Sequence, residues 1–318
     1  MYSVSNNFYD KSETYLLPLS KVYAGGEIAN PGYVDFSSLV KRSVIVKEAL
    51  PDDEGGNRFT GAFRYDGYSL FDILEKRILK KANEAEYSSV IDLFIEVENN
   101  EGDMAVFTWG DIYYPSDLHR IILADSVTRI IPTKTLDMWV LPLKNKVIAS
   151  GDLLTVRNIS DPVKITVRSI KRSFEFRKGL TPLYSEKILL YENSELKDEI
   201  FSLPESLNEI TYNTIFYGRG RGIHSTTPFT GIMLKEVLRK HFPVTEEKLK
   251  KGILCITGAD GYRCSVSFSE LFNRNDRQEF LIIPLGTGSD GGVFRIFPAA
   301  DFFSDRAVKS VKSIHLDF

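Results

Sequence analysis

Much of this amino-acid sequence consists of an internal repeat. Three blocks recur in the same order, with residues 65–74 returning at 229–238, residues 107–111 at 266–270, and residues 138–142 at 294–298. The shifts of 164, 159 and 156 residues drift, as duplication followed by changes in loop length would produce. Solenoid repeats have periods of only about 20–50 residues. The repeat therefore predicts two tandem units, each large enough to have a core of its own.

The composition is that of an ordinary globular protein, and it limits the partners. Hydrophobic residues make up 43% and charged residues 26% of the 318 residues. A net charge of −3 gives no general attraction to nucleic acid or to an anionic membrane, so neither is expected as a partner and any basic site has to be local. The sequence has no run of about 18 apolar residues and no leader-like start, which predicts a cytoplasmic protein.

The chain divides into a polar N-terminal arm, residues 1–18, a first unit, residues 19–172, and a second unit, residues 173–318. Ser69 and Asp72 have the spacing of a capping box, and the apolar periodicity then predicts a helix of about three turns from Leu70 to Ile78. The equivalent helix of the second unit begins at Leu234. Short β-branched runs surround both helices. We therefore expect an α+β fold, with mixed short strands and one main helix in each unit.

The second unit carries the candidate site. Residues 217–225 contain three glycines together with Arg219, Arg221 and His224. Glycines let backbone amides approach a ligand, and arginines bind phosphate with two parallel hydrogen bonds. A neutral histidine adds a hydrogen bond to a heterocycle or a phosphate. The alternative reading is a solvated hairpin loop, because the spacing matches neither the dinucleotide-binding nor the P-loop pattern.

A second basic group lies toward the C-terminus. The glycine-rich residues 286–292 precede a short strand that contains Arg295, and Lys309 and Lys312 follow in the last strand. Taken alone, these residues are typical of a long hairpin loop and a strand with solvated lysines.

Taken together, the segments of the second unit resemble a known family. In order, they are Phe-x-Gly-x-x-Leu-x-x-x-Leu at 229–238, Asp-Gly-Tyr at 260–262, a glycine-rich turn into Val-Phe-Arg-Ile-Phe-Pro at 293–298, and Val-Lys-Ser-Val-Lys-x-Ile at 308–314. This order is similar to that of the oxidoreductase molybdopterin-binding domain of the sulfite oxidase type. The resemblance covers most of residues 211–316 and, more weakly, residues 20–170.

The resemblance implies two tandem domains of that type and a pterin cofactor, molybdopterin or a related compound. Its phosphate would be held by basic side chains. Arg295, Lys309 and Lys312 occupy the family's basic positions, and the loop with Arg219, Arg221 and His224 precedes the glycine at the helix start. The first unit is degenerate, because the repeat sets Trp139 against Arg295.

One departure from the family changes the expected function. The family's enzymes bind molybdenum through a cysteine upstream of the helix-start glycine, whereas residues 217–221 and 53–64 contain none. The two cysteines, Cys255 and Cys264, follow the helix instead. A thiolate is a soft ligand suited to such metals. We therefore predict neither a metal site nor catalytic residues.

These observations favour a pterin-binding protein that takes a small pterin-like molecule and is not an enzyme. Two alternatives remain open. One is a molybdopterin-dependent oxidoreductase with an unusual metal environment, and the other is a non-catalytic protein-interaction module on the same fold. The sequence does not define the true ligand, a substrate, a redox partner, a protein partner or the oligomeric state.

Overall fold

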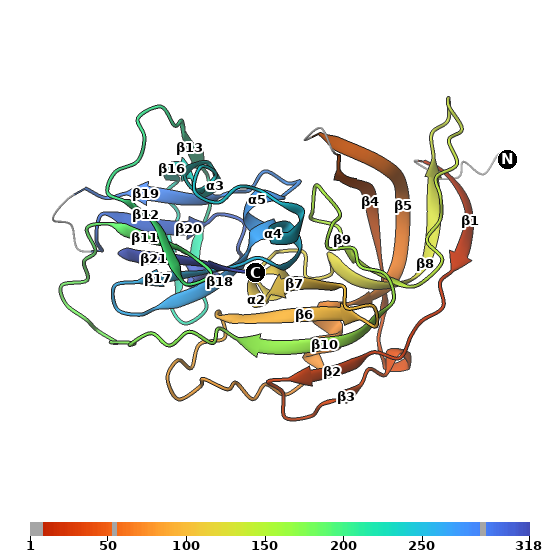
Figure 1. Ribbon diagram of the computed structural model, residues 1–318, viewed down its shortest axis with the longest axis horizontal. Coiled ribbons are helices and arrows are strands. Elements are labelled where there is room, and N and C mark those ends of the chain that lie inside the picture. Colours follow the sequence, from red (N-terminus) through yellow and green to blue (C-terminus); the bar gives the residue numbers. More distant parts are fainter. Residues whose placement is uncertain (1–8, 53–55, 287–290) are drawn as a thin grey trace.

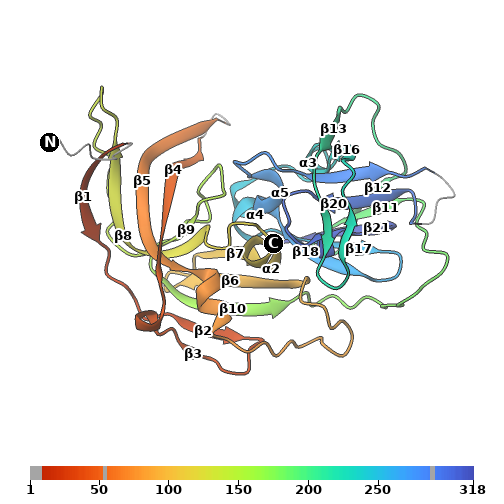
Figure 2. The same cartoon turned by 180° about the vertical axis from the view of Figure 1, so that it is seen from behind.

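The computed structural model describes residues 9–52, 56–286 and 291–318. Figures 1 and 2 show the two units side by side, with the N-terminus at the far end of the first unit. Of the expected N-terminal arm, residues 1–8 lie outside the described residues, and Asp10–Leu16 forms strand β1, which pairs with β8. Across the described ranges, no helix combines the length and the apolar character that crossing a membrane requires.

The predicted α+β class is wrong, because the protein is mostly β, with 44% strand and 11% helix. Every α-helix in the described ranges is five or six residues long: α1 (Leu70–Glu75), α2 (Trp109–Tyr113), α3 (Leu234–Leu238), α4 (Glu246–Lys251) and α5 (Phe268–Phe272). Ser69 does cap α1 by accepting a hydrogen bond from the Asp72 amide. The helix stops at Glu75, however, and Ile78 is 64% exposed. Apolar residues recur at helical spacing as far as Ile78, although the buried face of the helix ends earlier. The spacing therefore predicted a helix that is too long.

The first unit is built from two sheets. The long sheet has the order β1-β8-β5-β4, with β9 against β8; its strands are β1, β4 (Lys41–Pro51), β5 (Asn57–Ser69), β8 (Ile121–Ile131) and β9 (Lys146–Ala149). The second sheet has the order β3-β2-β10-β6-β7; its strands are β2 (Tyr23–Gly26), β3 (Gly32–Tyr33), β6 (Leu93–Asn99), β7 (Met104–Thr108) and β10 (Pro162–Ser169). The long sheet stands at the end of the molecule away from the second unit (Figure 1).

The second unit also has two main sheets. One has the order β12-β11-β21-β17-β18; its strands are β11 (Ile188–Glu192), β12 (Glu195–Ile200), β17 (Ile253–Gly258), β18 (Arg263–Ser267) and β21 (Val311–Asp317). The other has the order β13-β16-β19-β20; its strands are β13 (Glu209–Tyr212), β16 (Phe229–Met233), β19 (Phe280–Pro284) and β20 (Phe294–Pro298). A separate hairpin consists of β14 (Phe216–Gly218) and β15 (Gly222–Ser225).

The internal repeat is visible in the strand pairing. In the first unit Tyr68 of β5 pairs with Leu123 of β8, and in the second Ile232 of β16 pairs with Ile282 of β19. Gly67 and Gly231 lie one residue earlier, and a Cβ at either position would overlap the carbonyl of Leu123 or Ile282. Both copies therefore keep a glycine because two strands approach closely there.

One of the three repeat blocks was matched wrongly in the sequence. Arg295 pairs with Ile283 on β19, and the equivalent pair in the first unit is Lys146 with Ala124 on β8. The counterpart of Arg295 is therefore Lys146 and not Trp139. Trp139 instead packs against the outer face of the long sheet, where its indole donates to the Ile130 carbonyl. Similar hydrophobic composition produced the false match.

The units share one core. A continuous cluster of buried apolar side chains includes Leu70 and Phe107 of the first unit with Leu234, Phe268 and Ile314 of the second. Backbone hydrogen bonds also cross between the units. Because the helix starts α2 and α5 lie against this shared core, the polar groups at their N-termini are brought to the junction.

Candidate functional site

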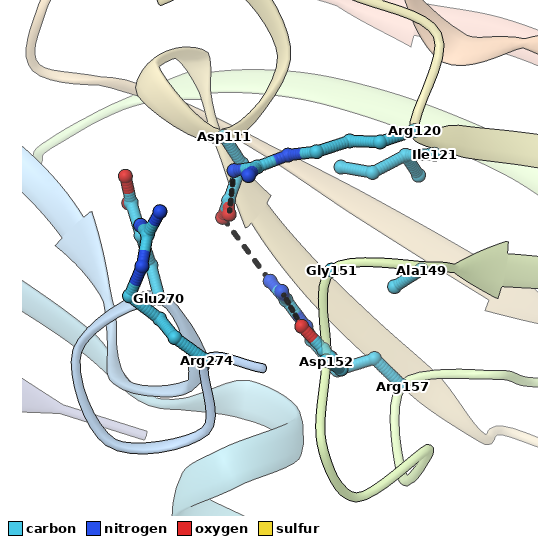
Figure 3. A pocket seen from close by; sticks show the side chains of 9 residues that line it. All are labelled: Asp111, Arg120, Ile121, Ala149, Gly151, Asp152, Arg157, Glu270 and Arg274. Carbon is cyan, nitrogen blue, oxygen red and sulfur yellow. Dashed lines mark hydrogen bonds and ion pairs between the residues drawn. The ribbon is translucent and has the colours of Figure 1, made fainter. Parts of the chain in front are cut away.

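A buried cluster of arginines and carboxylates lies where the units meet (Figure 3). On the first-unit side, Arg157 donates to both carboxylate oxygens of Asp152, at 2.8 and 2.6 Å, and to Asp111 at 3.1 Å. Asp111 is positioned by α2, where it forms a capping box with Thr108. The Arg157 side chain is 2% exposed. Bidentate pairing of this kind fixes the guanidinium geometrically as well as electrostatically.

The second unit repeats this arrangement. Arg306 donates to both oxygens of Asp301, at 2.8 and 2.6 Å, and to Glu270 at 3.0 and 2.5 Å. Glu270 occupies in α5 the place of Asp111 in α2, and Ser267 caps α5 as Thr108 caps α2. In each unit the paired aspartate lies five residues before the arginine. The two halves of the cluster are therefore copies of one motif.

The copies interlock through reciprocal hydrogen bonds. The hydroxyl of Thr108 donates to Glu270 at 3.1 Å, and that of Ser267 donates to Asp111 at 2.8 Å. Backbone amides follow the same exchange: Leu153 donates to the Asn273 carbonyl and Phe302 to the Tyr114 carbonyl. These contacts occur in pairs because each has its counterpart about an internal twofold axis. The junction is thus self-complementary, as in an isologous dimer interface.

Burial and neighbouring charges shift the pKa values of the carboxylates in this cluster in different directions. Burial opposes ionisation of Asp111, but the charges of Arg157 and Arg120 outweigh it and lower the pKa of Asp111 to about 2. For Asp301 burial is the larger effect; although Arg306 counteracts it, the pKa of Asp301 rises to about 6. Burial likewise raises the pKa of Asp152, the first-unit counterpart of Asp301.

The cluster has little room for a ligand. Its cavity measures about 10 Å³, which holds at most one water molecule. Figure 3 shows Asp111 between Arg120 and Arg157, with Glu270 and Arg274 approaching from the second unit. Because Arg157 and Arg306 are each engaged by two carboxylates, we assign the cluster to the junction between the units and not to ligand binding.

Three of the six predicted site residues lie on the β14–β15 hairpin. Arg219 and Arg221 are in its turn and exposed, and Arg219 comes only within 4.0 Å of Asp305. His224 is on β15, with its ring 5.0 Å from that of Phe216. A Cβ on Gly218 would lie 2.6 Å from Nε2 of His224, so the imidazole rests over that glycine. The hairpin therefore presents these cationic and polar groups from its turn and from one strand.

Arg295 lies beside this hairpin and is the half-buried member of the six. Its guanidinium carbon is 5.2 Å from the ring centre of Phe216 and 5.4 Å from that of Phe229. Within the described ranges no carboxylate forms an ion pair with Arg295, and its buried Nε has no hydrogen-bond partner. Burial lowers the pKa of Arg295 from its usual value. Since arginine stays charged at neutral pH, this is a partly desolvated cation that lies beside two aromatic rings.

The structure does not bring the two predicted lysines to Arg295. Lys309 lines a hollow of about 210 Å³ together with Tyr262. Lys312 lines a different hollow, of about 320 Å³, beside Tyr184. Both lysines are exposed. Of the glycine-rich turn expected to join this region, residues 287–290 lie outside the described residues. The fit to molybdopterin is therefore partial: Arg295 and the hairpin suit an anionic group, whereas the lysines face other hollows.

The cysteines lie in the interior of the second unit. Cys255 and Cys264 are free and buried on β17 and β18. Burial raises the pKa of Cys264 to about 12 and that of Cys255 well above its usual value. In the part of the chain that the structure describes, no group of three or more histidine, cysteine or acidic side chains has an arrangement that could hold a metal ion.

Sequence reasoning missed the cluster at the junction, although a signal was present. The spacing Asp-x-x-x-x-Arg occurs at Asp152–Arg157 and again at Asp301–Arg306. The two copies of this spacing are 149 residues apart, whereas the other repeated blocks are 164, 159 and 156 residues apart. The difference arises because the loops before the spacing differ in length between the two units.

No protein-family model and no curated protein sequence matches the chain. The likeness to the molybdopterin-binding domain therefore stays a prediction.

Proposed function

We propose that this protein binds a small anionic heterocycle of the pterin class and does not act as a catalyst on it. The binding site is the second-unit surface formed by Arg295 and the β14–β15 hairpin with Arg219, Arg221 and His224. The observation that carries the proposal is the state of Arg295, a half-buried guanidinium that has aromatic neighbours and no acidic partner among the described residues.

The energetics of Arg295 support an anionic ligand. Removing a cation from water costs several kcal/mol unless an opposite charge compensates for it. Contacts with aromatic faces return only about 0.5–2 kcal/mol. Elsewhere in this protein two fully buried arginines, Arg157 and Arg306, each have a bidentate carboxylate partner, and a third, Arg263, pairs with Glu86 and Asp92. A phosphate or carboxylate of the ligand would give Arg295 the partner that it lacks.

The neighbouring side chains support a planar ligand. Phe216 contacts both His224 and Arg295, so the hairpin and the sheet offer aromatic and cationic groups at one place. Aromatic surfaces bind the faces of heterocycles, and arginine and histidine hydrogen-bond to their polar edges and to attached anions. The resemblance of residues 229–238 and 293–298 to the pterin-binding family points to the same class of ligand.

The proposal is tested on the protein purified from its native host. Mass spectrometry and the fluorescence of acid-released, oxidised pterin should detect a bound pterin in the unaltered protein. Arg295→Ala should lose it, because the anion loses its buried counter-ion. Lys146→Ala is the matched control, since Lys146 holds the equivalent place in the first unit but is already paired with Glu48 at 2.6 Å. Retention of pterin by Arg295→Ala would disprove the site.

Titration with 6-carboxypterin and with uncarboxylated pterin tests the role of charge. The carboxylated compound should raise the melting temperature of the unaltered protein, since a ligand stabilises the state that binds it. It should have a much smaller effect on Arg295→Ala. Gly218→Ala should weaken binding moderately by displacing the His224 ring. Should neither pterin bind, the interaction-module alternative would be favoured, and the exposed apolar side chains of Leu136, Met138, Val140 and Leu143 would be its surface.

A further inference from the structure

A concave surface, distinct from the Arg295 region, lies at the junction between the units. Its volume is about 650 Å³, within the range of about 300–1,000 Å³ that small-molecule sites have. It lies between the outer face of sheet β10-β6-β7 and the second unit, where Phe318 and Lys251 of α4 also line it. Both ribbon views show the C-terminus between the two units (Figures 1 and 2). We call this surface the junction groove.

The floor of the junction groove is apolar. Phe94 of β6 and Ile253 of β17 line it from equivalent positions in the two units, and Val106 and Met104 of β7 continue it. Phe94, Val106 and Ile253 belong, together with Ile170 and Cys255, to a small hydrophobic cluster separate from the main core. Because strand residues alternate between faces, Phe94 points into the groove while its neighbours Leu93 and Ile95 belong to the main core.

The rim of the groove carries excess positive charge. Four basic residues line it, Arg168, Lys171, Arg172 and Lys251, against two acidic ones, Glu96 and Asp317. Arg168 forms an ion pair with Glu96 at 2.5 Å. The other three basic groups form weaker pairs or none among the described residues, so the local field favours an anion although the whole chain is slightly acidic.

Three cations of the rim have capacity for a ligand. Lys171 is exposed and forms no ion pair in the described ranges. Arg172 donates a hydrogen bond to the Ser194 hydroxyl at 3.0 Å and reaches Asp317 only at 3.5 Å, and its buried Nε has no hydrogen-bond partner among the described residues. Lys251 comes within 3.9 Å of Glu247, which is a weak exposed pair. An anionic head group could therefore bind all three without breaking a strong pair.

We propose that the junction groove binds an amphipathic carboxylate, with its hydrocarbon chain along Phe94, Val106 and Ile253 and its head group among Lys171, Arg172 and Lys251. The apolar floor favours a hydrocarbon chain, because it offers no hydrogen-bonding groups with which to read the edge of a nucleobase. The unsatisfied Nε of Arg172 favours an acceptor-only head group, and a carboxylate also suits the forked geometry of arginine. Such a ligand would bridge the two units.

Isothermal titration calorimetry of the full chain with sodium decanoate tests this proposal. We expect saturable binding with one molecule per chain, weakened by added salt because the rim charges are exposed. The neutral 1-decanol and the cationic decylammonium, measured below their aggregation limits, should bind at least about tenfold more weakly, a difference of about 1.4 kcal/mol. Equal binding of all three would indicate an apolar surface without a carboxylate site and would overturn the proposal.

Two variants address the two halves of the groove. Lys171→Glu combined with Lys251→Glu should weaken decanoate binding at least about tenfold, because two attractive charges become repulsive. Met104→Trp should block the hydrocarbon part while leaving the rim unchanged. Lys47→Glu, a reversal of an exposed lysine on β4, is the control and should bind as the unaltered protein does. Unchanged affinity in the charge-reversed variant, or in a folded Met104→Trp protein, would disprove the site.

Discussion

Arg157 and Arg306 are equivalent residues of the two units, and each is held at the junction by the same kinds of partner. Each pairs with an aspartate five residues earlier and with the first-turn carboxylate of its own unit's short helix. That carboxylate in turn accepts a hydroxyl hydrogen bond from the opposite unit. The internal duplication thus has a physical consequence, because each copy completes the hydrogen bonding of the other.

Removing either arginine should destabilise the whole protein. Arg306→Ala leaves Asp301 and Glu270 buried without their counter-ion, and breaking one side of a buried pair costs about 3–5 kcal/mol. Arg157→Ala should have a similar effect through Asp152 and Asp111. The free energy of unfolding from denaturant titration measures both losses.

Arg64→Ala is the control for those two variants. Arg64 pairs with Asp66 at 2.8 Å, but its side chain is 35% exposed. Exposed pairs contribute about 0–1 kcal/mol, so this variant should remain near the unaltered stability. A loss below about 1 kcal/mol for Arg306→Ala would show that the cluster does not hold the units together.

Gly110→Ala should disturb the cluster from the first unit. A Cβ on this α2 residue would overlap the guanidinium of Arg306, which comes from the second unit. Alanine is otherwise a better helix former than glycine by about 1 kcal/mol, so propensity alone predicts a gain in stability. We expect a loss of about 2 kcal/mol or more instead, because the Arg306 pairs have to shift.

Gly220→Ala provides the comparison for this substitution. Gly220 lies in the exposed turn of the β14–β15 hairpin, and a Cβ there would meet no atom within 4 Å. Its effect on the free energy of unfolding should stay within about 0.5 kcal/mol. A stabilised Gly110→Ala protein would contradict the close packing of Arg306 on α2.

Local features of the fold were predictable from the sequence, and the global class was not. The Ser69 cap, the equivalence of residues 65–74 with 229–238, and that of residues 107–111 with 266–270 follow from short patterns, and the structure confirms them. Helix length was overestimated, because Ile78 continued the apolar period into an exposed position. The sequence signal for a helix depends on periodicity, whereas its end depends on packing that the pattern does not contain.

The candidate site was predictable only in part, for a related reason. Residue type singled out Arg295 and the hairpin, and the structure brings Arg295, His224 and Phe216 together. The same reasoning grouped Lys309 and Lys312 with them, because neighbours in a motif were assumed to face one ligand. The lysines face separate hollows. The junction cluster escaped notice because its members come from both units, and contacts over such sequence distances leave no local pattern.

The two thiols should be inert in the native protein. Burial raises the pKa of Cys264 to about 12 and also raises that of Cys255, so neither forms appreciable thiolate at pH 8. Labelling with a thiol-reactive disulfide reagent should therefore proceed only as fast as the protein unfolds, and should reach both cysteines in denaturant. Rapid native labelling would mean that β17 and β18 open far more readily than their full burial indicates.

The stability of the protein should depend on Asp301 between about pH 4 and pH 6. Burial raises the pKa of Asp301 to about 6 in the folded state, whereas its ordinary value is 3.8. The folded protein therefore holds this proton more tightly, and stability falls as pH rises through that window and the carboxyl ionises. The contribution amounts to at most about 3 kcal/mol. Asp111 behaves oppositely, because its pKa is lowered to about 2; its stabilisation is present above about pH 4 and is lost as pH falls toward 2.

Asp301→Asn isolates this effect, because asparagine does not titrate while Asp111 is unchanged in both proteins. The free energy of unfolding is measured at intervals from pH 4 to pH 7 for each. The difference, unaltered protein minus variant, should decrease as pH rises from 4 to 6 and then level off, since a group ionised in both folded and unfolded states contributes no further change. Parallel curves across this range would mean that Arg306 keeps Asp301 ionised throughout, and that its buried ion pair outweighs the effect of burial.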